Sequence, residues 1–176
     1  MKELIKNIEQ WAEERNLIEG STPQKQMLKL MEEFGELCGG IAKNKPEVIK
    51  DSIGDCFVVL VILNLQHNWE VCFEDYKDKY VSKFIRTDLI PNGLNNLEII
   101  RDICSLIPSL YGINIKPVFD DYRYAIWSII VALEDLANIY DLSLIECIQH
   151  AYNQIKDRKG KMIDGVFVKE VDLQNE

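Results

Sequence analysis

The sequence lacks three features: an excess of basic residues, a long apolar run and a paired set of cysteines. Its 176 residues hold 20 Lys and Arg against 29 Asp and Glu, which gives a formal net charge of −9 at pH 7. We therefore expect no nucleic-acid polymer and no anionic membrane as a partner, although a small anionic substrate that arrives with a metal ion stays compatible with this charge. The longest apolar run, residues 56–63, is far too short to span a bilayer.

The start of the chain and the cysteines both point to the cytoplasm. The first residues, MKELIKNIEQW, are charged and helical in pattern, which does not fit a signal peptide. The five cysteines show no CxxC motif and no paired spacing, and most lie in apolar helical stretches. We therefore expect buried, reduced thiols in a cytoplasmic protein.

Helical periodicity dominates the chain, so the expected fold class is all-α. With 47% hydrophobic residues, the chain can form one compact domain or two small units that share a core. The pattern predicts helices over about residues 2–16, 22–43, 46–66 and 71–86. The second helix has Ser21 or Thr22 as N-cap and Pro23 in its first turn, and Pro46 opens the third.

Two clusters of carboxylates stand on the second and third predicted helices. Glu32, Glu33 and Glu36 project from one sector of the second helix, and Asp51 and Asp55 repeat that geometry on the third. Two antiparallel helices joined by a short loop would bring both clusters into one pocket. Closely packed like charges are energetically costly. A hard divalent cation such as Mg²⁺ would neutralise them and bind substrate phosphates at the same time.

A solvated acidic face explains the same glutamates equally well from spacing alone. With Met27 set at 0°, the apolar stripe of the second helix spans roughly 280° to 40°, while the glutamates lie at about 140° to 240°. They would then point away from the stripe, which comprises Met27, Leu30, Met31, Phe34, Leu37, Cys38 and Ile41.

The segments EEFGEL and KDSIGDCFVVLVIL resemble the all-α nucleoside triphosphate pyrophosphohydrolases of the MazG-like superfamily, which also includes the dimeric dUTPases. The family pattern is ExxE, a spacer, then ExxD. Glu33 and Glu36 match its first half and Asp55 matches its last position, but Ser52 stands where the third glutamate is expected, with Asp51 as a plausible substitute. The upstream Trp11, Gln26 and Lys29 make the chain most similar to small MazG-like proteins of phages and Gram-positive bacteria.

The resemblance implies a Mg²⁺-dependent hydrolase, in which Mn²⁺ could replace Mg²⁺. It would cleave a nucleoside or deoxynucleoside triphosphate to the monophosphate and pyrophosphate, and would so remove unwanted nucleotides from the cellular pool. It implies a metal site of Glu33, Glu36 and Asp55, joined by Glu32 or Asp51, with Glu36 or Glu33 as the general base. The basic residues expected to contact the substrate are Lys29, Lys79, Lys83, Arg86, Arg158 and Lys159. A solvated basic face and a mobile tail are equal alternatives for the last five.

The second half of the chain resembles the first when it is shifted by 73 residues. Apolar positions then coincide, while the acids of the first half meet residues without a carboxylate. We therefore predict a MazG-like unit at residues 1–90, a degenerate copy at 91–160 and a tail at 161–176, in which Asp164 and Gly165 suggest a small β-hairpin. Such a chain would be a pseudo-dimer in itself, and a further homodimer is compatible with it.

Two other functions fit the sequence. One is a protein of this fold that senses a nucleotide or alarmone without turning it over, which the Ser52 departure permits. The other is a structural helical module that acts through protein contacts. The base and the sugar of a substrate are not specified by the sequence, because side chains scattered around a pocket would recognise them.

Overall fold

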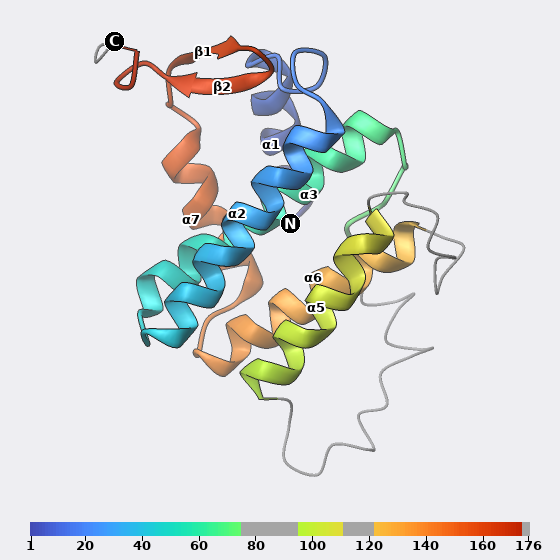
Figure 1. The fold of residues 1–176 in the computed structure, drawn as a ribbon, viewed down its shortest axis with the longest axis vertical. Coiled ribbons are helices and arrows are strands. Elements are labelled where there is room, and N and C mark those ends of the chain that lie inside the picture. Colours follow the sequence, from blue (N-terminus) through green and yellow to red (C-terminus); the bar gives the residue numbers. More distant parts are fainter. Residues whose placement is uncertain (75–94, 111–121, 174–176) are drawn as a thin grey trace. The chain divides into compact units, whose positions relative to one another are not determined.

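The computed structural model describes residues 1–74, 95–110 and 122–173. These residues form an almost entirely helical structure with one small antiparallel sheet, which confirms the predicted all-α fold class (Figure 1). No helix in these ranges is both long enough and apolar enough to cross a membrane. The elements are α1 (Lys2–Glu14), α2 (Pro23–Ala42), α3 (Pro46–His67), α5 (Asn96–Leu110), α6 (Tyr122–Ile139), α7 (Leu144–Ile155), β1 (Gly160–Ile163) and β2 (Val166–Lys169).

The chain divides into two compact units. The first combines residues Met1–Asn68 with Ile145–Glu176, and the second is Trp69–Leu144. The first unit thus contains α1, α2, α3, the hairpin and nearly all of α7, and the second contains α5 and α6. The predicted division at residues 90 and 160, and the pseudo-dimer that follows from it, stay predictions about the origin of the sequence.

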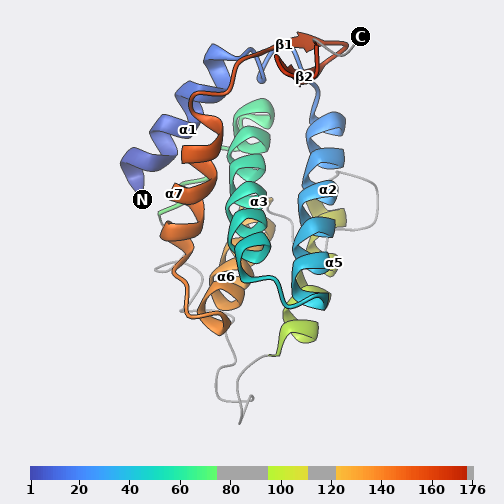
Figure 2. The same ribbon diagram turned by 90° about the vertical axis from the view of Figure 1, so that its left-hand side faces the viewer.

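An antiparallel pair of helices, α2 and α3, is the centre of the first unit. Thr22 caps α2, because its Oγ1 accepts a hydrogen bond from the backbone N–H of Lys25 at 3.3 Å, and Pro23 occupies the first turn. Pro46 opens α3 after a short loop. α3 is buried along most of its length and apolar all round after Asp55. Figure 2 shows it between α2 and α7.

Close packing between α3 and α7 depends on a glycine. A Cβ atom built on Gly54 would overlap the carbonyl oxygen of Cys147 and press against Ala151. Only a residue without a side chain therefore lets the two backbones approach this closely. This contact ties the C-terminal part of the chain to the helix that carries Asp55.

The C-terminal hairpin has the turn that its sequence predicts. Strands β1 and β2 pair antiparallel with Gly160 opposite Lys169, and Asp164 and Gly165 occupy the turn with φ of 48° and 76°. Positive φ at both central residues is typical of a type I′ turn, in which Asp-Gly is strongly favoured. The predicted hairpin is confirmed.

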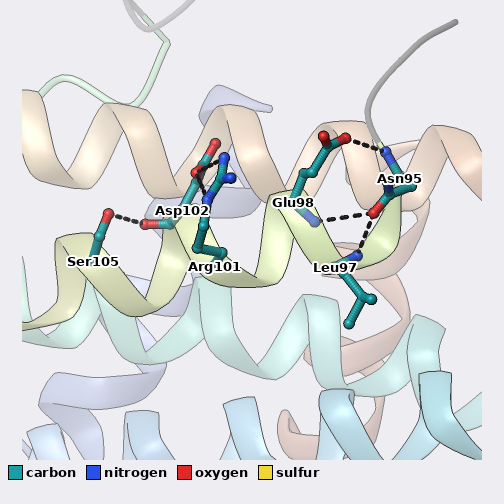
Figure 3. Close-up of polar contacts among 6 residues, drawn as sticks. All are labelled: Asn95, Leu97, Glu98, Arg101, Asp102 and Ser105. Carbon is teal, nitrogen blue, oxygen red and sulfur yellow. Dashed lines mark hydrogen bonds and ion pairs between the residues drawn. The ribbon is translucent and has the colours of Figure 1, made fainter.

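Helix α5 of the second unit is capped at its start. The side chain of Asn95 accepts hydrogen bonds from the backbone N–H groups of Leu97 at 3.0 Å and Glu98 at 3.1 Å (Figure 3). The Glu98 carboxylate in turn accepts from the backbone N–H of Asn95 at 3.1 Å, so the two residues form a reciprocal capping box. Exposed polar contacts follow on the same helix, including those between Arg101 and Asp102.

Two of the four helix bounds in the second unit agree with the 73-residue shift, whereas the shifted end of α2, 115, and the shifted start of α3, 119, lie outside the described residues. Adding 73 to the first residue of α2, Pro23, gives 96, where α5 begins, and adding 73 to the last residue of α3, His67, gives 140, one residue past the end of α6. The duplication remains a prediction, since helix lengths alone do not establish it.

Two smaller expectations need correction. Residues 71–74 are not helical, and the rest of the helix expected over 71–86 lies outside the described residues. Cys56 and Cys147 are buried as predicted, whereas Cys72 and Cys104 are exposed, and none of the five cysteines forms a disulfide. Cys104 lies on the outer face of the amphipathic helix α5, where the apolar pattern is one-sided.

Candidate active site

A pocket of about 540 Å³ lies within the first unit, between α2 and α3 and against α1 and the hairpin. Its volume is in the range of small-molecule sites. Acidic, basic and apolar side chains share its wall. The lining comprises Trp11, Leu17, Lys25, Gln26, Leu28, Lys29, Glu32, Glu33, Asp55, Val58, Val59, Ile62, Ile155, Arg158, Gly165, Val166, Phe167 and Lys169.

Glu33 and Asp55 face this pocket from the two central helices. Glu33 is only 5% exposed, and Asp55 is half-buried at the edge of the apolar part of α3. The Lys29 ammonium group forms an ion pair with Glu33 and another with Glu32, whose Oε2 lies 3.0 Å from Nζ. A single cation therefore bridges two carboxylates at the pocket wall.

Burial and repulsion both act on these two carboxylates. Burial raises the pKa of Asp55 to about 7, and the negative charges of Glu33 and Asp51 add to this effect against the weaker opposing influence of Lys29 and Arg158. Burial also raises the pKa of Glu33, partly offset by its hydrogen bond from Lys29. The two carboxylates thus lie close enough to repel each other, although the pocket wall as a whole has four basic residues against three acids.

The two carboxylates are enough to hold a magnesium ion, because Mg²⁺ does not require a complete set of protein ligands. Among residues 1–74, 95–110 and 122–173, no three His, Cys, Asp or Glu side chains converge as a preformed metal site. Mg²⁺, however, is usually held by one or two carboxylates together with waters and substrate phosphates. Glu33 and Asp55 supply two hard oxygen donors at one pocket, and Lys29 already shows that a positive charge is favourable between the glutamates.

The other predicted ligands lie farther out. Glu32 is on the pocket wall, whereas the exposed Glu36 is not part of it. The Asp51 side chain is 41% exposed, and its Oδ1 lies 3.4 Å from Nε2 of His150 on α7 without a hydrogen bond between them. Asp51 therefore neighbours Asp55 on the side of α7, and its role as a replacement ligand remains a prediction.

Of the predicted substrate contacts, Lys29 and Arg158 line the pocket. Lys159 is exposed and is not part of the wall. Three further candidates, Lys79, Lys83 and Arg86, lie outside the described residues.

A clamp on α1 holds the segment that carries Arg158. The indole N–H of Trp11 donates to the carbonyl oxygen of Ile155 at 2.9 Å. The Arg15 guanidinium, stacked 5.1 Å from the Trp11 ring, donates to the carbonyl oxygens of Lys156 at 2.7 Å and Arg158 at 3.1 Å. These bonds satisfy carbonyl groups that the end of α7 leaves without helical partners. The clamp thereby fixes the start of the hairpin against the pocket.

Sequence patterns missed part of this site. The solvated-face interpretation is wrong for Glu33, because the buried face of α2 is rotated toward α3 and leaves Met31 49% exposed instead. Lys25 and Lys169 were not predicted, although Lys25 lies four residues before Lys29 on the same helix face, a spacing that would have indicated it. Nothing in the sequence indicated Lys169, since its position depends on how the hairpin docks.

Comparison with known proteins bears on the part of the chain that holds α2 and α3. Residues 21–88 match the family described as the MazG nucleotide pyrophosphohydrolase domain, which confirms the predicted resemblance. A protein of Haemophilus phage HP1 (strain HP1c1), described as an uncharacterized 18.2 kDa protein in the rep-hol intergenic region, is 72% identical over 74 residues. These residues are 42% of this chain and 45% of the phage protein, so the match spans less than half of either. No solved structure matches the chain.

Proposed function

With residues 21–88 matching a MazG nucleotide pyrophosphohydrolase domain, we propose that the protein hydrolyses a nucleoside triphosphate to the monophosphate and pyrophosphate with Mg²⁺. The observation that supports this most is the pairing of two buried or half-buried carboxylates, Glu33 and Asp55, which interact across one pocket that also holds basic residues. A triphosphate is itself strongly anionic, so a divalent cation bound between these carboxylates and the phosphates would offset their mutual repulsion.

Glu33, Asp55 and Glu32 would hold the ion, and Glu36 and Asp51 remain the further ligands that the sequence predicts. When bound, a divalent cation supplies positive charge against the phosphates. Lys29 and Arg158 add cationic groups that act on Asp55, and Lys25 and Lys169 line other parts of the same pocket. Mn²⁺ prefers the same oxygen donors and could replace Mg²⁺.

Glu33 is the better of the two candidate bases, because it faces the pocket whereas Glu36 is exposed outside its wall. Its carboxylate would take a proton from a water molecule as the water oxygen forms a bond to the α-phosphorus. The bond from the α-phosphorus to the oxygen that bridges to the β-phosphate breaks, and pyrophosphate leaves with that electron pair. The apolar side chains of Val58, Val59 and Ile62 would limit the access of other water.

Pyrophosphate and orthophosphate release from nucleoside triphosphates, measured for matched variants, tests this proposal. We expect Glu33→Gln to lower Mg²⁺-dependent pyrophosphate release by at least about 100-fold, because it removes both a ligand and the proposed base. Glu47→Gln is the control, since Glu47 is an exposed carboxylate on α3 away from the pocket. Equal activity of Glu33→Gln and the control would refute the proposed site.

A further inference from the structure

We propose that Gln26 recognises the base of the nucleotide, at the end of the pocket opposite Glu33 and Asp55. This inference rests on the proposed function, because it assumes that the acidic end receives the phosphates. The antiparallel helices define the two ends. Gly40 packs against Ile49, and the charges of Glu33 and Asp55 interact, so residues of α2 and α3 whose numbers sum to about 88 lie at the same level along the helix pair.

The same relation places Gln26 at the level of Ile62 at the other end of the pocket, and both residues line it. Seven residues separate each of these from the acidic end, which on an α-helix is a distance of about 10 Å. A sugar and its first phosphate bridge a gap of that order. The pocket is therefore long enough to hold the phosphates at one end and the base at the other.

Apart from Gln26 and Lys25, the wall at this end is mostly apolar. Leu17 and Ile62 contribute aliphatic surface, and the hairpin turn rests here because a Cβ atom on Gly165 would meet the Lys25 side chain and the carbonyl oxygen of Gly20. The hairpin also contributes Phe167 to the lining. Apolar walls with few polar groups are typical of the part of a site that binds a flat heterocycle.

Within that wall, Gln26 has a hydrogen-bonding capacity that no other uncharged lining side chain of the described residues has. It is 7% exposed, and its Nε2 donates to the hydroxyl oxygen of Ser21 at 3.1 Å. One N–H and the carbonyl oxygen of the amide are left for a ligand. Trp11, the other uncharged polar side chain of the wall, already uses its N–H to bind the carbonyl oxygen of Ile155.

A carboxamide held by a neighbouring hydroxyl matches the chemistry of a nucleobase edge. The amide can donate and accept at the same time, and the hydrogen-bonding edge of each base offers a donor beside an acceptor. Because Ser21 restrains the amide, Gln26 loses less freedom on binding than a mobile side chain would. A base whose edge does not complement the amide would leave buried polar groups unpaired, which is how such sites discriminate.

Recognition of the base can be separated from binding of the phosphates by comparing ligands with and without a base. Tripolyphosphate is the ligand without a base. The nucleotide ligands are ribo- and deoxyribonucleoside triphosphates that have a methylene group between the α- and β-phosphates and therefore cannot release pyrophosphate. We expect wild type to bind its preferred analogue more tightly than tripolyphosphate. Gln26→Met, which keeps the side-chain volume, should lower the affinity for that analogue about tenfold and change the affinity for tripolyphosphate less than twofold.

Two further variants make the test specific. Gln24→Met, an exposed glutamine on the same helix, should leave all affinities unchanged, and Ser21→Ala should give a smaller loss with the same dependence on the base. Equal losses for the analogue and tripolyphosphate, or no loss in Gln26→Met, would overturn the inference, as would a wild type that prefers no analogue over tripolyphosphate. Base-dependent binding without any pyrophosphate release from natural triphosphates would uphold the role of Gln26 and refute the proposed hydrolysis.

Discussion

Replacement of Asp55 by asparagine should stabilise the metal-free protein at alkaline pH. Burial and the neighbouring charges of Glu33 and Asp51 raise the pKa of Asp55 from 3.8 to about 7. The folded protein therefore holds this proton more tightly than the unfolded chain does. The stability that Asp55 contributes is fully present below about pH 4 and is lost as the pH rises through about 7.

The size of this loss follows from the shift. A difference of about three pKa units corresponds to about 4 kcal/mol at 1.4 kcal/mol per unit. Water reaches this half-buried group and screens its charge, so we expect an effect of about 2 kcal/mol at pH 8.5. Asparagine keeps the shape of the side chain but carries no charge, and the variant should avoid the loss.

Urea unfolding of wild type and Asp55→Asn at pH 5 and pH 8.5, both in chelator, measures the difference. The free energy of unfolding of the variant should exceed that of wild type by about 2 kcal/mol at pH 8.5 and by less than half of that at pH 5, which lies about one unit above the unfolded pKa. Asp51→Asn should raise the free energy of unfolding at pH 8.5 by less, because it removes only part of the repulsion on Asp55. Saturating Mg²⁺ at pH 8.5 should stabilise wild type and not Asp55→Asn. A difference in the free energy of unfolding between wild type and Asp55→Asn that is the same at both pH values would refute the reasoning.

Two other predictions concern packing. Arg15→Ala should cost about 1–2 kcal/mol in the free energy of unfolding and speed amide hydrogen exchange in residues 160–169, because two hydrogen bonds to the start of the hairpin are lost. Arg15→Lys should not restore the protection, since an ammonium group cannot reproduce the two-pronged contact, and unchanged exchange in both variants would contradict the clamp. Gly54→Ala should lower the thermal midpoint, because the added methyl group overlaps Cys147, whereas Gly39→Ala, with open space around it, should raise stability by about 0.5–1 kcal/mol. Equal effects of the two alanines would show that α3 and α7 are not packed as described.

Local sequence rules predicted the elements that position the site. Pro23 and Pro46 fixed the starts of α2 and α3, and the Asp164-Gly165 pair fixed the hairpin turn. These signals are short-range, since each depends on the backbone preferences of one or two residues. The same is true of the two acids, whose helical spacing predicted that they would meet across an antiparallel pair.

The rest of the site depends on contacts between distant parts of the chain. Glu33 lies off the apolar stripe of α2, so its burial depends on how α2 is rotated toward α3. The sequence of α3 does not predict that rotation, because after Asp55 this helix is apolar all round and has no distinct buried face. Lys169 and Phe167 join the pocket because the hairpin docks beside α2. Helical periodicity carries no information about that docking.

Hydrolysis of nucleoside triphosphates in ¹⁸O-labelled water tests the central claim most directly. The account predicts that wild-type protein with Mg²⁺ releases pyrophosphate from at least one of the common ribo- or deoxyribonucleoside triphosphates, with the label in the monophosphate and no release in chelator. Label in the pyrophosphate, orthophosphate as the product, or no hydrolysis of any nucleotide would contradict it.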